Sequence, residues 1–563
     1  MKTKIFFGVI IFIAAGIVLT SLFQGRINKD FVENKNDNCT YSKLSSSTIA
    51  YYHAGWEFLK TRDPATNVLP PDIKAKELKY VSGIPAKTDY LKMSEKQTAP
   101  EQYRDQAWES MGPDNICGRI LAVELDIENE NIILAGSASG GLWRSTDAGV
   151  SWVKTTALNA VQSVTCIEQD IREGETNTWY YGTGELTSTT DRQFSIFPRT
   201  VGFGNGIFKS TDNGATWALL QSTSGGITGE LTEAFQGIWN IATDPGNQEN
   251  DIVYVAGYGG ILRSDDGGDT WSHVLGDVIT KSFCTDVIIS PDGVIYAALG
   301  TFSTNESGIM PTVFGIWKSV DGLNWTSITP AGFPSNYRTI KLEVPESNPD
   351  ALYVLTENPI PDPDATFSFT ASEHKLWKGS HLNTEEPEWV ERTDNIPGKG
   401  KGNILVGFYD PPHGYNSIAG YAMMLTAHPE NEEILFLGGT NLYRNDTGFT
   451  DSTFTRLLGG YPYDGTHDNL HPDLHSVKFL PSNPEVMFAA CDGGLFKTMN
   501  CLADSEVWEY ISDNLITTQF YWVGIDHAGV EDDFVIGGCQ DNAIYYHDSY
   551  FPASAWKTII GGD

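Results

Sequence analysis

The sequence predicts an all-β protein, a β-propeller of seven or more blades that follows an N-terminal export signal and a polar lead-in. Three observations predict this fold. A turn motif recurs at the spacing of propeller blades, short β-branched and aromatic runs alternate with Gly/Asp/Asn turns, and the composition is rich in glycine. The chain has 56 glycines among 563 residues, and only 19% of its residues are charged. This composition suits short strands and tight turns better than helices.

The turn motif begins with a glycine-led strand, passes through an aspartate and ends at a tryptophan. Its four copies are GLWRSTDAGVSW at 141–152, GIFKSTDNGATW at 206–217, GILRSDDGGDTW at 260–271 and GIWKSVDGLNW at 315–325. Successive aspartates are 65, 54 and 55 residues apart. A period of about fifty residues with about four short strands in each unit indicates one propeller blade per repeat.

Turn chemistry explains the motif. Gly214 supplies a positive φ without Cβ strain, Asp212 accepts backbone N–H groups inside the turn, and Trp217 lays an apolar ring on neighbouring strands. We therefore expect the motif to be structural. The residues expected to hold the turns are Ser145, Asp147, Gly149, Trp152, Ser210, Asp212, Gly214, Trp217, Ser264, Asp266, Gly268, Trp271, Ser319, Asp321 and Trp325.

Degenerate copies of the same hairpin continue to the end of the chain, giving eight in all. The last is FVIGGCQDNAIYYHD at 534–548. Seven blades plus the start of a second ring is one arrangement, and a single ring of ten blades is the other. The expected division is a signal peptide or signal anchor at 1–25, a polar and partly helical lead-in at 26–107, the propeller at 108–525, and the last blade or the start of a truncated second propeller at 526–563.

The N-terminus predicts export, and the cysteines predict neither a dense disulfide framework nor a zinc site. Two lysines precede an uncharged run at 5–23, which is typical of an export signal. A cleaved signal peptide and an uncleaved anchor both stay open. The seven cysteines cannot all pair, although Cys491 and Cys501 flank one hairpin and could bridge. Without a C-x-x-C motif, a cysteine-type zinc site is not expected.

The charge balance argues against nucleic acid as a partner. Lys and Arg number 37 against 72 Asp and Glu, a formal net charge of −35. A surface this acidic repels phosphate backbones. Partners are therefore expected among extracellular polysaccharides, peptides or proteins, and a membrane only through an N-terminal anchor.

The repeated S-x-D-x-G-x-x-W pattern resembles the Asp-box, or BNR, repeat of sialidase-like propellers. That superfamily includes sialidases, sortilin-type propellers and tandem-propeller xyloglucanases, and its Asp boxes lie on the blade periphery. Together with WESMGPDNICGRI, HPDLH, CDGGLFKT and GGCQDNA, the motif is similar to large secreted bacterial BNR proteins of sortilin-like type. Many of those proteins use type IX secretion, so the resemblance implies an exported chain that is part of a larger protein.

The resemblance also bears on catalysis. Sialidases need an F-R-I-P-like segment early in the propeller, whereas the closest string here, SIFPRT at 195–200, has the wrong order. Xyloglucanase-like propellers use two carboxylates across a cleft as general acid and base. One of them lies in an R-T-D-I-G-G-A-Y-R-like strand, and matching the paired glycines places Ala138 where that Asp should be. The second would belong to a later propeller.

Three polar turns supply the candidate catalytic residues. They are Glu185 after Gly-Thr-Gly, Asp473 in THDNLHPDLH, and Asp541 in GCQDN. For each, a carboxylate that holds its own loop is the competing interpretation. On a strand, H-x-D-x-H would point His471, Asp473 and His475 to one face, a set that suits a metal. No cofactor is expected, and a structural divalent cation at this set is the alternative.

Ligand contacts are expected from these turns and from aromatic loops that could stack on sugar rings. The candidates are His467, His471, Asp473, His475, Tyr409, Tyr415, Tyr461, Gln540, Asp541 and Asn542. The sequence favours a cell-surface or secreted binding module for glycan, peptide or protein, because Ala138 removes the best-placed acid. Whether the chain is an enzyme stays open. The alternative is a glycoside hydrolase of xyloglucanase-like type acting on β-glucan polysaccharides.

Overall fold

The computed structural model describes most of the chain from residue 110 onward. The described residues are 110–186, 204–224, 233–276, 282, 285–301, 311–359, 372–384, 387–398, 414–418, 420–460, 470–504, 506–525, 534–548 and 556–560, together with 76 and 79. The predicted signal at 1–25 lies outside these residues, as does nearly all of the lead-in. Among the described residues, no helix has the length and hydropathy that crossing a membrane would require.

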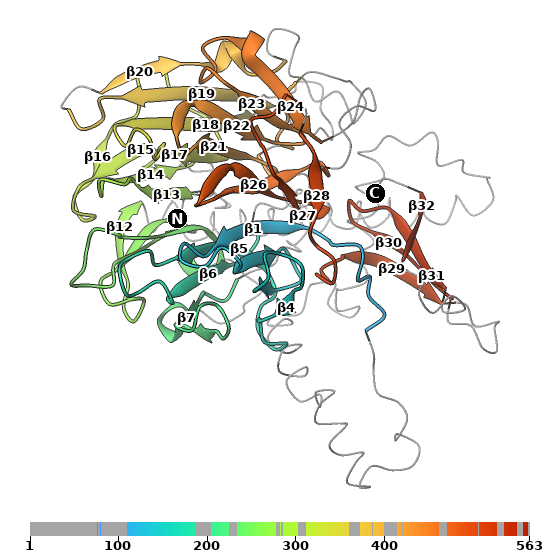
Figure 1. The fold of residues 1–563 in the computed structure, drawn as a ribbon. Helices are drawn as coiled ribbons and strands as arrows, with labels where there is room; N and C mark the ends of the chain where they lie inside the picture. Colours follow the sequence, from blue (N-terminus) through green and yellow to red (C-terminus); the bar gives the residue numbers. More distant parts are fainter. Residues whose placement is uncertain are drawn as a thin grey trace, which may run out of the picture. The chain divides into compact units, whose positions relative to one another are not determined.

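Eight antiparallel sheets of four strands follow one another along the chain (Figure 1). The first three contain β1 (Ile120–Leu125), β2 (Ile133–Ser137), β3 (Leu142–Ser145) and β4 (Val153–Lys154); β5 (Val164–Gln169), β6 (Trp179–Thr183), β7 (Ile207–Ser210) and β8 (Ala218–Leu219); and β9 (Ile238–Thr243), β10 (Val253–Gly257), β11 (Gly260–Ser264) and β12 (Ser272–Gly276). The next three contain β13 (Thr285–Ile289), β14 (Ile295–Leu299), β15 (Gly315–Ser319) and β16 (Thr326–Ser327); β17 (Ile340–Glu343), β18 (Ala351–Pro359), β19 (Ser372–Ser380) and β20 (Glu388–Glu391); and β21 (Met424–His428), β22 (Asn431–Gly438), β23 (Leu442–Asn445) and β24 (Thr455–Gly459). The last two contain β25 (Leu474–Leu480), β26 (Asn483–Cys491), β27 (Gly494–Thr498) and β28 (Trp508–Tyr510); and β29 (Phe520–Ile525), β30 (Phe534–Cys539), β31 (Ile544–Asp548) and β32 (Lys557–Ile560). Short 3-10 turns are η3 (Gln221–Thr223), η4 (Ala234–Gln236), η5 (Thr393–Asn395) and η6 (Ser452–Phe454).

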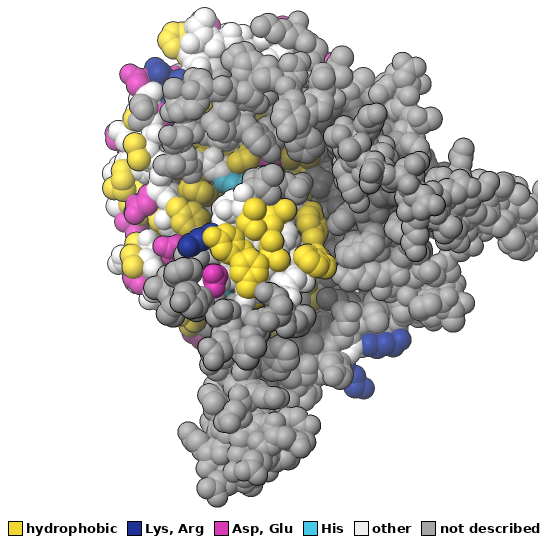
Figure 2. Space-filling view, turned by 90° about the vertical axis from the view of Figure 1, so that its right-hand side faces the viewer, with side chains coloured by type: hydrophobic (Ala, Val, Ile, Leu, Met, Phe, Trp, Pro, Cys, Tyr) yellow, Lys and Arg dark blue, Asp and Glu magenta, His cyan; other side chains and the backbone are white. Residues whose placement is uncertain are grey.

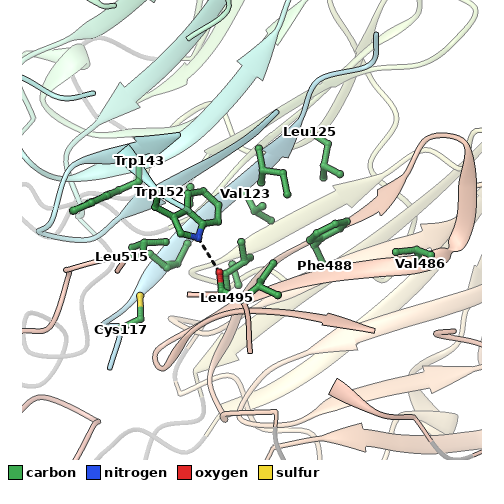
Figure 3. Packing of buried hydrophobic residues seen from close by; sticks show 14 residues of the cluster. Cys117, Val123, Leu125, Trp143, Trp152, Val486, Phe488, Leu495 and Leu515 are labelled. Atoms are coloured by element: carbon green, nitrogen blue, oxygen red, sulfur yellow. Dashed lines mark hydrogen bonds between the residues drawn. The ribbon is translucent and has the colours of Figure 1, made fainter. Parts of the chain in front are cut away.

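Buried hydrophobic clusters join each of the first six sheets to the next, and the seventh back to the first. In the closing cluster, Val123 of β1 packs with Phe488 of β26 and Leu495 of β27 (Figure 3). The Trp152 indole N–H donates to the Ile511 carbonyl across this contact at 2.8 Å. The predicted β-propeller is thus confirmed, and seven sheets close on one another.

The eighth sheet lies outside that closure. It packs on the segment that precedes β1, where the Trp556 indole N–H donates to the Met111 carbonyl at 2.6 Å. Its register repeats that of the first sheet: Trp522 pairs with Gly538 after a bulge, as Ala122 pairs with Gly136. Ala122 is 7% exposed, however, and Trp522 is 61% exposed. Figure 2, turned toward the side on which this sheet lies, shows hydrophobic side chains gathered there.

The first three of the four repeated turns share one hydrogen-bond pattern. In the second copy, Ser210 Oγ donates to Asp212 Oδ1 at 2.8 Å and accepts the Gly214 N–H at 3.0 Å. Asp212 also accepts the N–H of Thr216 at 2.8 Å and its hydroxyl at 2.6 Å. The same contacts recur around Asp147 and Asp266. In the shorter fourth copy, Asp321 accepts instead from residues 323 and 324.

Replacing Asp212 by alanine is expected to lower the free energy of unfolding by about 1 kcal/mol or more, because several N–H and O–H donors lose their acceptor. Ligand binding and activity should be unchanged. Urea titration measures the first effect. Thr211→Ala in the same exposed turn is the matched control and should be nearly neutral. Loss of activity in Asp212→Ala without loss of stability would contradict the structural role.

In two sheets, a carboxylate on the first strand accepts a backbone N–H group from the first strand of the following sheet. Glu168 on β5 accepts the Thr243 N–H at 3.1 Å, and Glu343 on β17 accepts the Ala427 N–H at 2.8 Å. Across the ring closure, Lys478 on β25 pairs with Glu124 on β1 at 2.5 Å. Burial raises the pKa of Glu168 and of Glu343 to about 7, against the opposing effect of these hydrogen bonds.

Stability should therefore fall as the pH rises toward and past neutrality. A carboxyl whose pKa is higher in the folded state contributes stability that is complete below its unfolded pKa of about 4.3 and is lost as the pH rises through about 7. Denaturant titrations between pH 5 and pH 8 should show this slope, and Glu343→Gln should flatten it. Glu388→Gln, at an exposed position, is the control and should retain the full slope. An unchanged slope in Glu343→Gln would contradict this origin.

The cysteine expectation needs a correction. The five described cysteines are Cys117, Cys166, Cys491, Cys501 and Cys539, and all of them are free and buried. Cys491 and Cys501, which could have formed a bridge, are not joined. Each lies in an apolar cluster instead, where a thiol packs as a small hydrophobic group.

Candidate functional site

Polar side chains meet at the edge of the propeller where each first strand begins and each second strand ends. Ile120 at the start of β1 pairs with Ser137 at the end of β2, and the same relation holds for β25 and β26. Arg119 directly precedes β1, and Asp492 directly follows β26. Antiparallel pairing and ring closure therefore bring these two residues to the same edge.

Arg119 is the centre of this group and is 4% exposed. Its Nε and Nη2 donate to the two oxygens of Asp492, at 2.7 and 2.8 Å. Nη2 also pairs with Asp541 in the turn between β30 and β31. A bidentate arginine–carboxylate pair is geometrically specific, and here one guanidinium joins the first, seventh and eighth sheets.

Asp492 has further partners. His475 Nε2 lies 2.6 Å from Asp492 Oδ1, and the side-chain amide of Asn542 donates to the Asp492 carbonyl at 2.8 Å. Asp541, beside Asn542, has a φ of +59°. Aspartate tolerates this left-handed conformation better than most residues, which lets the turn reach back to the seventh sheet.

Tyr421 joins this group to the second sheet. Its ring centroid lies 4.9 Å from the guanidinium carbon of Arg119, and its ring meets His475 edge-on at 5.0 Å. Its hydroxyl donates to Glu185 Oε1 at 2.9 Å. Gly184, at a φ of +102°, turns the chain after β6 so closely against Gln236 that an added Cβ would lie 2.2 Å from the Gln236 carbonyl oxygen. This turn places Glu185 at the edge. We call Arg119, Glu185, Tyr421, His475, Asp492 and Asp541 the Arg119 cluster.

Within the Arg119 cluster, the pKa values of Glu185 and Asp492 are shifted in opposite directions. Burial raises the pKa of Glu185, while Arg119 and the Tyr421 hydroxyl oppose the rise. Burial would also raise the pKa of Asp492, but Arg119 and His475 outweigh it and hold that pKa well below its ordinary value. Neighbouring carboxyls that favour opposite protonation states are the arrangement that acid–base chemistry uses.

The structure brings together four of the residues that the sequence singled out, Glu185, His475, Asp541 and Asn542, in or beside the Arg119 cluster. Gln540 adjoins it, with its backbone N–H donating to the Gln519 carbonyl at 2.9 Å. Candidates His467, Tyr409 and Tyr461 lie outside the described residues.

The expected one-face arrangement of H-x-D-x-H is wrong. Strand β25 begins only at Leu474, and Asp473 has a φ of +67°, which breaks the alternation of an extended chain. Asp473 instead joins two loops through its backbone, with its carbonyl accepting the Asp492 N–H at 3.2 Å. His471 is directed to the neighbouring Pro472 carbonyl at 3.0 Å. Among the described residues, no three His, Cys, Asp or Glu are grouped so as to hold a metal.

Tyr415 also differs from its expected role. It is 2% exposed, and its hydroxyl donates to the Gly438 carbonyl at 2.9 Å, so its ring belongs to the core and offers no face to a sugar. Sequence reasoning missed Arg119, Tyr421 and Asp492. Their one signal was position beside a glycine, because Arg119 follows Gly118, Tyr421 follows Gly420 and Asp492 precedes Gly493.

The fold is that of a β-propeller, and parts of the chain are similar to known proteins. No family model matches the chain. Over 241 residues it is 27% identical to the xyloglucanase Xgh74A of Acetivibrio thermocellus, covering 39% of this chain and 26% of that protein. Over 303 residues it is 25% identical to a xyloglucanase of a Paenibacillus species, covering 43% and 29%. The matched part thus spans less than a third of either relative.

Solved structures of GH74 enzymes share the fold. An ancestral GH74 enzyme superposes with a TM-score of 0.51 at 16% identity, over 78% of this chain and 54% of that one. The GH74 xyloglucanase of Xanthomonas campestris gives a TM-score of 0.51 at 14% identity, over 77% and 59%. At these identities the likeness establishes the propeller architecture.

Proposed function

We propose that this chain acts on extracellular polysaccharide as a glycoside hydrolase, with the Arg119 cluster as its active centre. The observation that carries the proposal is the pairing of Glu185, whose pKa is raised, with carboxylates fixed by Arg119 at the same edge of the propeller. A carboxyl whose pKa is raised keeps its proton to a higher pH than usual and can protonate a glycosidic oxygen, while an ionised partner activates water.

In this proposal, Glu185 is the general acid. Its Oε1 accepts from Tyr421, and its Oε2 is the proposed donor to the leaving-group oxygen. Asp541 is the proposed base, because its side chain is 22% exposed while Asp492 is 2% exposed. Arg119 holds both carboxylates in place. Export by a type IX route, expected from the sequence, stays a prediction.

The two curated relatives support polysaccharide as the substrate class, since both are xyloglucanases. A specific observation favours a second candidate, a glycan-binding module without turnover. Ala138 stands where the resemblance places one catalytic Asp, and its N–H donates to the Arg119 carbonyl at 3.3 Å, at the same edge. Hydrolysis therefore requires carboxylates other than the one that the resemblance implies.

The test is to assay the full chain on a panel of plant and algal polysaccharides, with reducing-end release and affinity electrophoresis measured on the same samples. Release of reducing ends from a β-glucan, lost on Glu185→Gln, supports the hydrolase. Retarded migration on a glycan without any release supports the binding module. If Glu185→Gln and Asp541→Asn both release reducing ends at the wild-type rate, the Arg119 cluster is not the active centre.

A further inference from the structure

The segment that carries Tyr421 is held by a second buried polar group, centred on His374 and Ser417. His374 lies on β19, in the part of the β18–β19 hairpin that extends past the four- or five-residue second and third strands of the first four sheets (Figure 1). It is 4% exposed, and its Nε2 lies 2.6 Å from Ser417 Oγ, which is fully buried. Tyr421 follows Ser417 by four positions in the sequence.

Between these two residues the chain makes a tight turn. Ile418 and Gly420 have φ values of +48° and +78°, and the Gly420 N–H donates back to Ser417 Oγ at 2.9 Å. The Thr339 hydroxyl donates to the Gly420 carbonyl at 3.0 Å. An isoleucine in the left-handed region is strained, so this turn persists only because its surroundings hold it.

His374 acts here as a neutral hydrogen-bonding group. Burial lowers the pKa of His374 to about 4, with nearby Glu357 opposing and Arg338 adding to the effect. Glu357 lies directly across from His374 on β18, and Arg338 donates to both of its oxygens. His374 is therefore a buried and uncharged hydrogen-bonding partner of Ser417 over the ordinary pH range.

We infer that His374 and Ser417 are positioning residues that hold the turn so that Tyr421 meets Glu185. The inference rests on the proposed function and deepens it, because the turn then regulates the protonation of the proposed acid. The Tyr421 hydroxyl donates to the Glu185 carboxylate, and a hydrogen bond to the charged form favours that form. Without the anchor, Tyr421 leaves this geometry and Glu185 holds its proton more tightly.

The groups that face Glu185 are Arg119, Tyr421, His475 and Asp492. Ser417→Ala touches none of them, so any change at Glu185 must pass through the turn. Ser290→Ala is the matched control. Ser290 is also fully buried, accepts the Val294 N–H and donates to the Val294 carbonyl at 3.0 Å each, and lies in a hairpin turn of the fourth sheet.

The experiment titrates Glu185 directly, by difference infrared spectroscopy of its carboxyl band in the full chain, with Glu185→Gln as the blank. The Glu185 pKa should rise by about one pH unit in Ser417→Ala, in Tyr421→Phe and in His374→Phe, as expected for loss of one hydrogen bond to the ionised form. Ser290→Ala should leave it unchanged. His374→Gln, which keeps a polar group near Ser417, should restore most of the wild-type titration.

The pH profile of hydrolysis supplies the second measurement, and its alkaline limb should move with the Glu185 pKa. A Glu185 pKa that rises in Tyr421→Phe but not in Ser417→Ala overturns the positioning role. If Tyr421→Phe leaves the Glu185 pKa unchanged, the hydrogen bond from Tyr421 does not influence the protonation of Glu185, and the inference is wrong. If no polysaccharide is hydrolysed, the proposed function fails, while the infrared titration still decides whether the turn controls Glu185.

Discussion

Glu185→Gln is expected to lower the rate of polysaccharide hydrolysis by about 10²–10⁴-fold, the usual contribution of a positioned general acid. Glutamine keeps the shape of the side chain and its hydrogen bond from Tyr421, but it carries no proton to donate. The folded state should therefore survive. Reducing-end release measured at saturating and at limiting polysaccharide separates kcat from KM, and the loss should lie in kcat.

The matched control for this variant is Glu173→Gln, in the exposed connection between β5 and β6 of the same sheet. It should hydrolyse at the wild-type rate. A leaving group that needs little protonation, such as a nitrophenolate, should recover part of the lost rate in Glu185→Gln. Equal losses on both kinds of substrate would indicate that Glu185 holds the loop and does not act as an acid, the competing interpretation of this residue from the sequence.

The sequence predicted the propeller because each repeat encodes its own local structure. Asp212 and its neighbours make a turn from residues within seven positions of one another, so the pattern is readable without knowing the fold. The register is equally local, since strand alternation and the bulge recur from sheet to sheet. Turn chemistry and strand periodicity are therefore enough to predict most of the architecture from the sequence.

Only some residues of the candidate site could be predicted from the sequence, because the others meet only in the folded chain. Glu185 and Asp541 are conspicuous in their own turns, but Arg119 and Asp492 are 373 residues apart and meet only because the ring closes. Asp492 in Asp-Gly-Gly looks like a turn former until its oxygens are seen to accept from Arg119. Asp473 shows the opposite failure, because a positive φ at one residue removed it from a strand that its pattern predicted.

Replacing Arg119 by methionine should lower the free energy of unfolding strongly. Methionine fills much of the volume but leaves the Asp492 carboxylate, 2% exposed, without its bidentate partner. Breaking a buried ion pair by removing one member costs about 3–5 kcal/mol, because the remaining charge is desolvated and unpaired. Denaturant titration of the full chain, followed by tryptophan fluorescence, measures the loss.

Arg456→Met is the matched control. Arg456 pairs with Asp504 at 2.8 Å, but their side chains are 43% and 86% exposed, and such a pair contributes about 0–1 kcal/mol. A similar loss in both variants would show that Arg119 contributes as an ordinary surface charge. Adding Asp492→Asn to Arg119→Met should recover part of the stability, because the amide carries no uncompensated charge.

The position of Arg119 also predicts where the structure should loosen. Its guanidinium joins the seventh sheet through Asp492 and the eighth through Asp541, so the two contacts can be removed separately. Asp541→Asn should raise amide hydrogen exchange in β29–β31 alone, since the eighth sheet lies outside the closed set of seven. Arg119→Met should raise it there and also along β1 and β26, where Val123 packs on Phe488 at the closure. Exchange confined to β29–β31 in both variants would mean that apolar packing alone closes the ring and that Arg119 serves only to hold the carboxylates of the cluster.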